Sequence, residues 1–186
     1  MKDILICQRC DLYLNQKPLL DNLNNGDVMW VGLSSKKVDS TKEDIPLSRN
    51  TNSGRIIQNI EDSNVGVSFY KTNLVKCLPL DEKLKIRYPN EKEKESCYYN
   101  LELELSIINP KVVFLLGLKT ADFVLSKYKE RIRKLDVHFK YKIYPHNEIN
   151  FVPIHHPSYI YMHKGEKMDD YTNSVSLIIE NLMKNE

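Results

Sequence analysis

The chain has 186 residues, of which 41% are hydrophobic and 28% charged, a composition typical of globular proteins. Its formal net charge of +2 excludes a uniformly basic nucleic-acid binder but leaves room for a local basic face. No apolar run reaches the roughly 18 residues of a membrane span, and the N-terminal apolar stretch is too short for a signal peptide. We therefore expect a cytoplasmic protein without a membrane partner, whose four cysteines are thiols or metal ligands rather than disulfides.

Predicted strands and helices alternate along the chain. Apolar runs rich in β-branched and aromatic residues predict buried strands at 28–31, 69–75, 111–116 and 149–154. Helical spacing of apolar residues predicts helices at 54–60, 91–108 and 119–128, and a last one near the C-terminus. Residues 135–143 alternate between polar and apolar, which predicts a half-exposed edge strand. The pattern favours an α/β fold with three layers (α/β/α) and a central, mostly parallel four-stranded sheet, in a single domain over residues 1–186.

The segments that follow the predicted strands carry the polar residues of interest. Ligands of parallel sheets bind outside the carboxyl ends of the strands. We therefore expect segments 32–39, 76–77 and 155–158, together with Gly117, to meet in one crevice. The first segment resembles an anion-binding loop, but it has one glycine where a phosphate cradle usually has two or three.

Four cysteines could together form a metal site. Cys7 and Cys10 form a C-x2-C pair, Cys77 follows a predicted strand, and Cys97 lies in the long predicted helix. Four thiolates suit zinc or an iron–sulfur cluster. Because only one pair is closely spaced, the pattern favours a cluster, with zinc as the alternative. A plainer interpretation is that Cys97 belongs to the apolar face of its helix and that the pair is incidental.

Several short motifs follow one another over nearly the whole chain: C-x2-C, VG at 31–32, TNLVKC at 72–77, RYP at 87–89, Cys97, INPKVVFLLG at 108–117 and HPSY at 156–159. Their order resembles that of family 4 uracil-DNA glycosylases. The resemblance implies a uracil-DNA glycosylase fold and a [4Fe–4S] cluster on Cys7, Cys10, Cys77 and Cys97. It also implies DNA as the partner, single-stranded or containing uracil or a modified base, and we expect a monomer.

The resemblance assigns roles to the crevice residues. Glycosylases extrude the target base into a pocket and read its edge. Asn73 is similar to the family asparagine that binds uracil, since an amide donates and accepts at once; the alternative is a residue that caps its own backbone. His156 is similar to the histidine that donates to the developing uracil anion. Asp39 falls where the water-activating carboxylate lies, and Gly32, Leu33 and Ser34 occupy the first motif.

Further residues are expected at the DNA. Ser158, Tyr159 and Ile160 follow the histidine where the family inserts a loop into the minor groove, and Arg87 belongs to a second DNA-facing loop. An apolar wedge at Tyr159 and Ile160 fits this role. The alternative is that they anchor an ordinary surface loop.

The sequence also departs from the family pattern. The first motif of the family is Gly-Glu-Ala-Pro-Gly, and only Gly32 of it remains. Leu47 replaces the aromatic residue that stacks on uracil, which forfeits roughly 1–3 kcal/mol per base. A misplaced donor of the first motif costs about 10²–10³ in rate. We therefore expect a diverged or pseudo-enzyme member whose uracil excision is weak, altered in base preference or lost. The alternatives are an active uracil-DNA glycosylase and a non-catalytic interaction module.

Overall fold

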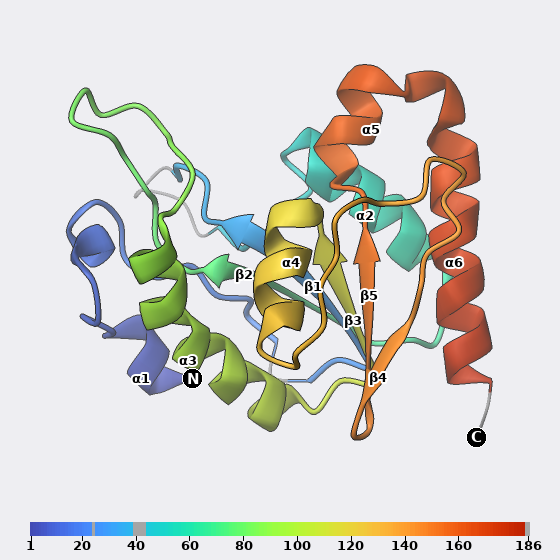
Figure 1. The fold of residues 1–186 in the computed structure, drawn as a ribbon, viewed down its shortest axis with the longest axis horizontal. Helices are drawn as coiled ribbons and strands as arrows, with labels where there is room; N and C mark the ends of the chain where they lie inside the picture. The colour runs from blue at the N-terminus through green and yellow to red at the C-terminus, as the bar shows by residue number, and fades with distance from the viewer. Residues whose placement is uncertain (24, 39–43, 185–186) are drawn as a thin grey trace.

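The computed structural model describes residues 1–23, 25–38 and 44–184, and its centre is a β-sheet (Figure 1). The described strands are β1 (Val28–Ser34), β2 (Phe69–Val75), β3 (Val112–Leu116), β4 (Tyr144–His146) and β5 (Ile149–Ile154), in the spatial order β2-β1-β3-β5-β4. The first four in that order pair in parallel, and β4 pairs antiparallel with β5. The expected parallel core of four strands is confirmed, and β4 adds a fifth strand at its edge.

Six described α-helices surround the sheet: α1 (Lys2–Leu5), α2 (Asn52–Ser63), α3 (Glu91–Ile108), α4 (Leu118–Ser126), α5 (Pro157–His163) and α6 (Met168–Met183). Short 3-10 turns lie at Asp11–Leu14 and Gly165–Lys167. Helix α3 begins where predicted because Asn90 and Glu93 form a capping box. Among the described residues, no helix has the length and apolarity needed to cross a membrane.

The two faces of the sheet bury separate cores, which confirms the three layers. Side chains alternate along β1: Met29 and Val31 join the core under α3 and α4, whereas Val28 and Trp30 join the core under α2 and α6. Figure 1 shows α1, α3 and α4 on one side of the sheet and α2, α5 and α6 on the other. Both faces of the parallel strands are therefore covered, as their continuous apolar runs require.

The predicted edge strand at 135–143 was wrong, because local side-chain hydrogen bonds fold this segment into a turn. The carboxylate of Asp136 accepts from the backbone N–H groups of His138 (2.8 Å) and Lys140 (3.1 Å). Phe139 takes a left-handed conformation (φ 59°) and is buried in the core. An aspartate that bonds its own backbone competes with a strand ladder, so the edge strand begins only at Tyr144.

Candidate functional site

A crevice of about 840 Å³ opens at the carboxyl ends of the parallel strands. Residues of the predicted segments 32–39 and 155–158, together with Gly117, line it, so these parts converge as expected. Segment 76–77 does not line it; after β2 the lining comes from residues 86–88, and further residues come from the start of α2. The volume lies within the range of small-molecule sites. Of the predicted site residues, those lining the crevice are Leu33, Ser34, Leu47, Asn73, Arg87, His156, Ser158 and Tyr159.

Asn73 lies near the end of β2 and is buried. It stands opposite Gly32 in the parallel pairing of β1 with β2. A Cβ on residue 32 would collide with the Asn73 Oδ1 atom, so only glycine leaves room for this amide. No described residue hydrogen-bonds the Asn73 side-chain amide, which leaves its donors and acceptor available to a ligand in the crevice.

A fully buried network of polar side chains contacts the main chain of Asn73. Lys76 and Glu104 form an ion pair with no solvent exposure on either side chain. The Lys76 Nζ also donates to the Asn73 main-chain carbonyl (2.5 Å) and to Thr72 Oγ1 (2.8 Å). The hydroxyls of Thr72 and Tyr70 each donate to Glu104 Oε1 at 2.8 Å. The network therefore holds the backbone that carries Asn73.

His156 caps the N-terminus of α5 through its ring. Its Nδ1 accepts from the backbone N–H of Ser158 (3.2 Å) and lies 2.7 Å from the Ser158 hydroxyl. Because Nδ1 accepts a backbone N–H, the neutral ring carries its proton on Nε2. Burial lowers the pKa of His156 from 6.5 to about 4. The histidine is therefore a neutral donor at physiological pH.

The chain around His156 fixes its place in the crevice. Gly117, at the junction of β3 and α4, has a φ of +86° that favours glycine. A Cβ there would come to 3.4 Å from the His156 Cβ, and the Gly117 N–H donates to the Ile154 carbonyl (2.8 Å). The ends of β3 and β5 are thus held close together beside the histidine.

The loop after β1 is held by Gln16, which the sequence analysis missed. Its Nε2 donates to Ser35 Oγ (2.9 Å) and to the Lys36 carbonyl (3.0 Å), and its Oε1 accepts from the Val38 N–H (3.0 Å). Lys36 also pairs with Asp44 at 2.8 Å. The rewritten first motif therefore has a defined path as far as Val38. The predicted catalytic Asp39 lies outside the described residues.

Leu47 lines the crevice in a left-handed conformation (φ 52°). This conformation costs a non-glycine residue roughly 1–2 kcal/mol. The carbonyl oxygens of Leu47 and Ser48 pack so closely on Gly54 that a Cβ on residue 54 would collide with both. The crevice is therefore lined at this position by the aliphatic side chain of Leu47.

The predicted DNA-facing residues differ in their accessibility. Tyr159 is 42% exposed and its ring stacks on that of His155 (centroids 5.6 Å apart). Ser158 faces the crevice but bonds His156. The assignment of Ile160 to a DNA wedge was wrong: segment 157–163 is a helix, and Ile160 lies on its inner face with no exposure. The wedge prediction therefore rests on Tyr159 alone.

Arg87 is occupied by partners within the protein. Its guanidinium binds both carboxylate oxygens of Glu93 (2.5 and 2.8 Å) and donates to the carbonyls of Leu80 (2.9 Å) and Tyr88 (3.0 Å). The ion pair lowers the pKa of Glu93 and raises that of Arg87. Arg87 therefore holds the loop between β2 and α3, and its contact with DNA stays a prediction.

The charged side chains that line the described crevice are all cationic. Among its described lining residues, Lys36, Arg87 and Lys119 are cationic and none is a carboxylate. Lys36 and Arg87 are paired with Asp44 and Glu93 just outside the lining. Lys119 has no carboxylate partner among the described residues, and its charge favours an anionic ligand or a group that becomes anionic.

The four predicted cysteine ligands gather between α1, α3 and the end of β2. All four are free thiols, and Cys77 and Cys97 are buried. Burial and the nearby sulfurs of the other three cysteines raise the pKa of Cys77 to about 12. Burial also raises the pKa values of Cys97 and Cys10. Protonated thiols with raised pKa values become thiolates only when a cation replaces their protons.

The surroundings of the sulfurs suit thiolate ligands. Asn100 Nδ2 lies 3.3 Å from the Cys7 Sγ and 3.7 Å from the Cys97 Sγ, and the backbone N–H of Lys76 donates to the Cys97 Sγ (3.3 Å). Hydrogen bonds to sulfur tune iron–sulfur clusters. Within residues 1–23, 25–38 and 44–184, however, no group of three or more Cys, His, Asp or Glu side chains is arranged to hold a single metal ion. The donor types are those of a thiolate-bound group, and the arrangement of the described side chains does not distinguish a cluster from zinc.

These features define a class of protein. A covered parallel sheet that brings an unpaired amide and a neutral histidine into one crevice is suited to binding a base. The profile of the uracil DNA glycosylase superfamily matches residues 16–176. The chain belongs to this superfamily.

Within the superfamily the chain is a family-4-like member. It is 24% identical over 168 residues to a type-4 uracil-DNA glycosylase of Sulfurisphaera tokodaii, covering 84% of this chain and 72% of the relative. It is 22% identical over 189 residues to a type-4 uracil-DNA glycosylase of Archaeoglobus fulgidus, covering 97% and 90%. The crystal structure of wild-type Pedobacter heparinus SMUG2 matches the fold with a TM-score of 0.60 at 17% identity, over 88% of this chain and 79% of that one.

The buried ion pair leads to a stability prediction. Glu104→Gln leaves the Lys76 charge unpaired in the interior and should lower the free energy of unfolding by about 3–5 kcal/mol. The double variant Lys76→Met/Glu104→Gln contains no buried charge and should regain part of that loss. Urea denaturation measures both. Glu91→Gln, which breaks an exposed ion pair with Lys94, should change stability by less than about 1 kcal/mol. If Glu104→Gln and Glu91→Gln lowered the free energy of unfolding equally, the Lys76–Glu104 pair would not be the buried ion pair described here.

The lowered pKa of His156 leads to a pH prediction. The folded protein keeps this ring neutral down to about pH 4, whereas the unfolded chain binds a proton below about 6.5. Acidification therefore favours the unfolded state, and His156 should cost on the order of 2 kcal/mol between pH 7 and pH 5. Urea denaturation of the wild type and of His156→Gln at both pH values measures the part of the stability loss that comes from His156. An imidazole resonance of His156 that titrates near pH 6.5 would refute the prediction.

Proposed function

We propose that the protein is a diverged family-4-like uracil-DNA glycosylase homologue that binds DNA through a flipped base and excises uracil weakly, prefers another base or has lost excision. The observation that carries the proposal is the composition of the crevice. Asn73 and His156 line it together, while Leu47 stands at the position where the family places its stacking ring. Asn73 and His156 can still form hydrogen bonds to a base, but Leu47 provides no aromatic ring to stack on it. We take residues 1–186 as one domain of a monomeric, cytoplasmic protein.

The chemistry available to the crevice follows from its donors. The Asn73 amide can pair with neighbouring donor and acceptor atoms on a pyrimidine edge. When the bond between C1′ and the base breaks, its electron pair leaves with the base, which becomes an anion. The neutral His156, protonated on Nε2, can donate to the oxygen on which that charge gathers. Water then adds to C1′ and gives up a proton, for which Asp39 is the proposed acceptor.

Two changes weaken this chemistry. Without a stacking ring, binding of the base loses roughly 1–3 kcal/mol. The first motif, held by Gln16 along 35–38, lacks the proline and second glycine of the family, so its backbone donors follow a different path. Leu47 also leaves more room beside the base than an aromatic ring would, which suits a base with an added substituent.

The second candidate function is efficient uracil excision. It is favoured by one observation: the amide of Asn73 and the Nε2–H of His156 are both left without a described partner in the same crevice. The two functions differ in rate and not in the kind of site, so an excision assay separates them.

We also propose that Cys7, Cys10, Cys77 and Cys97 bind a [4Fe–4S] cluster. The gathered thiols and the N–H groups directed at their sulfurs support it. Such a group would cross-link α1, the end of β2 and α3 through four covalent bonds. The residues of this site are separate from those that line the crevice.

The excision prediction uses single-stranded DNA with one uracil and catalytic amounts of protein. Wild type should release uracil slowly or not at all, and Asn73→Ala should remove any release. Leu47→Phe should raise release or base affinity by roughly tenfold, because it restores a stacking ring. Leu47→Met, which has similar volume and no ring, is the control. Robust multiple-turnover release by wild type would establish the second function instead, and no DNA binding at all would favour an interaction module.

The cluster prediction is tested by metal analysis of freshly, anaerobically prepared protein. We expect a brown protein with about four iron atoms per chain. Cys77→Ser should lose most of the iron, whereas Ser126→Ala, whose hydroxyl bonds the Phe123 carbonyl and no thiol, should keep it. Zinc alone in the wild-type protein would contradict the cluster.

A further inference from the structure

An exposed aromatic residue stands at the mouth of the crevice. Tyr88 is 68% exposed and lines both the crevice and a second groove of about 450 Å³ beside it. Leu33 and Lys119 line the same two hollows. Tyr88 and Lys119 therefore form part of the ridge that divides them. Sequence reasoning assigned neither residue a role.

The backbone of Tyr88 is held in place although its ring is exposed. Its carbonyl accepts from Arg87 Nη1 (3.0 Å), and the same guanidinium binds Glu93 through both carboxylate oxygens. Glu93 closes the capping box of α3. This chain of contacts ties the tyrosine to a helix of 18 residues. An aromatic side chain on a fixed backbone loses little freedom when a ligand binds to it.

A cation covers one face of the Tyr88 ring. The Lys119 Nζ lies 4.3 Å from the ring centroid, and Lys119 belongs to the first turn of α4, the helix that Gly117 precedes. The exposure of the ring leaves its other face open to solvent. An aromatic face beside an ammonium group matches a nucleotide, whose base stacks on rings and whose phosphate pairs with cations.

We propose that Tyr88 and Lys119 form a binding site for a nucleotide adjacent to the target base in single-stranded DNA. The base of that nucleotide stacks on the open face of Tyr88, and Lys119 pairs with its phosphate. This inference rests on the proposed DNA binding and adds the residues that hold the strand outside the crevice. An unpaired strand is the partner, because a base inside a duplex already stacks on its neighbours and has no free face.

The ring of Tyr88 supplies an aromatic face that the lining at Leu47 lacks. Leu47 supplies no aromatic face to the target base, so affinity for DNA must come from elsewhere. On the opposite rim, Tyr159 is exposed and packed between the rings of His155 and His163. Figure 1 shows the loop between β2 and α3 and helix α5 projecting from the same end of the molecule, so a strand over the crevice passes between them.

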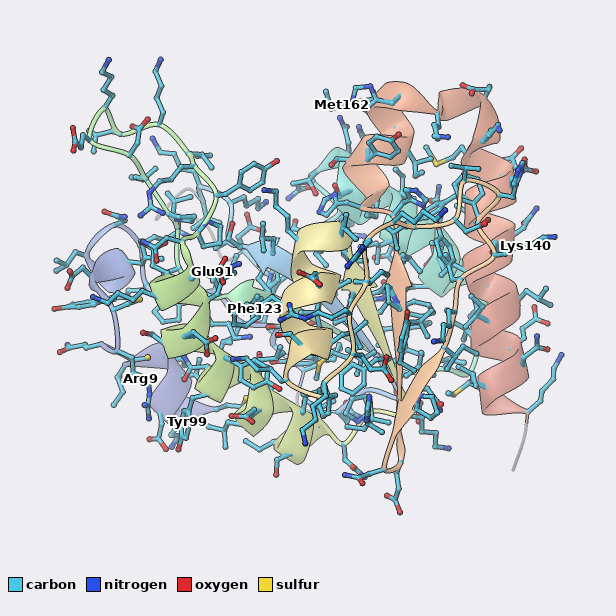
Figure 2. All side chains as sticks on the ribbon, in the orientation of Figure 1. Arg9, Glu91, Tyr99, Phe123, Lys140 and Met162 are labelled. Atoms are coloured by element: carbon cyan, nitrogen blue, oxygen red, sulfur yellow. The ribbon has the colours of Figure 1, made fainter. Side chains whose placement is uncertain are left out.

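Binding of a labelled single-stranded oligonucleotide with one uracil, followed by fluorescence anisotropy, tests the site. Tyr88→Ala should weaken binding about tenfold, whereas Tyr88→Phe should bind as wild type does. Lys119→Ala should lower the slope of log K against log salt by about 0.7, and Lys119→Arg should restore it. Two controls are matched in chemistry. Tyr99→Ala removes an exposed ring under Arg9, placed elsewhere in Figure 2, and Lys142→Ala removes a lysine over Tyr144. Both should leave binding unchanged.

Oligonucleotides with an abasic residue next to the uracil identify the stacked base. An abasic residue on one side, 5′ or 3′, should weaken wild-type binding about tenfold, and Tyr88→Ala should add no further loss on that oligonucleotide. The inference would be overturned if Tyr88→Ala bound as wild type does. It would also be overturned if Tyr88→Ala weakened binding to both abasic oligonucleotides by the same factor as on the intact one. Either result would leave DNA binding itself intact. Absence of any DNA binding by wild type would overturn the proposed function itself.

Discussion

Lys76 and Glu104 meet in the interior, where neither side chain is exposed to solvent. Two buried charges persist only when their remaining donors and acceptors are satisfied, and here the Thr72 hydroxyl and the Asn73 carbonyl help to satisfy them. The pair joins the end of β2 to the middle of α3. Because Asn73 precedes Lys76 and Cys77 follows it, one network determines where both the amide proposed to bind the base and a predicted cluster ligand lie.

The rest of the crevice is built on this rigid frame. The residues proposed to recognise the base lie at strand ends: Asn73 on β2, which Gly32 accommodates, and His156 after β5. The parts that differ from the family lie in the loops, at Leu47 and along the segment that Gln16 holds. A sheet with two covered faces tolerates changes in such loops, since the loops contribute little to either core. The proposed divergence of function is therefore compatible with an unchanged fold.

The features that were predicted correctly depend on local patterns. Strand 69–75 and helix 91–108 have the predicted bounds, because an apolar run and a capping box with an asparagine–proline stop act over a few residues. Segment 135–143 was predicted wrongly because the Asp136 side chain overrides the polar–apolar alternation. Helix α5 was missed, although Pro157 at its first turn was a usable signal. That error placed Ile160 on the surface instead of in the core.

By itself, the sequence determined the alternation of strands and helices, the family, the amide and histidine of the crevice, and the four thiols of a separate site. Only the tertiary structure decided which side chains are free to act. It occupied Arg87 with Glu93, buried Ile160, set His156 as a neutral donor and placed Tyr88 beside Lys119 at the rim. The physical reason is that periodicity and capping act between near neighbours in the chain, whereas desolvation and ion pairing depend on groups that only folding brings together.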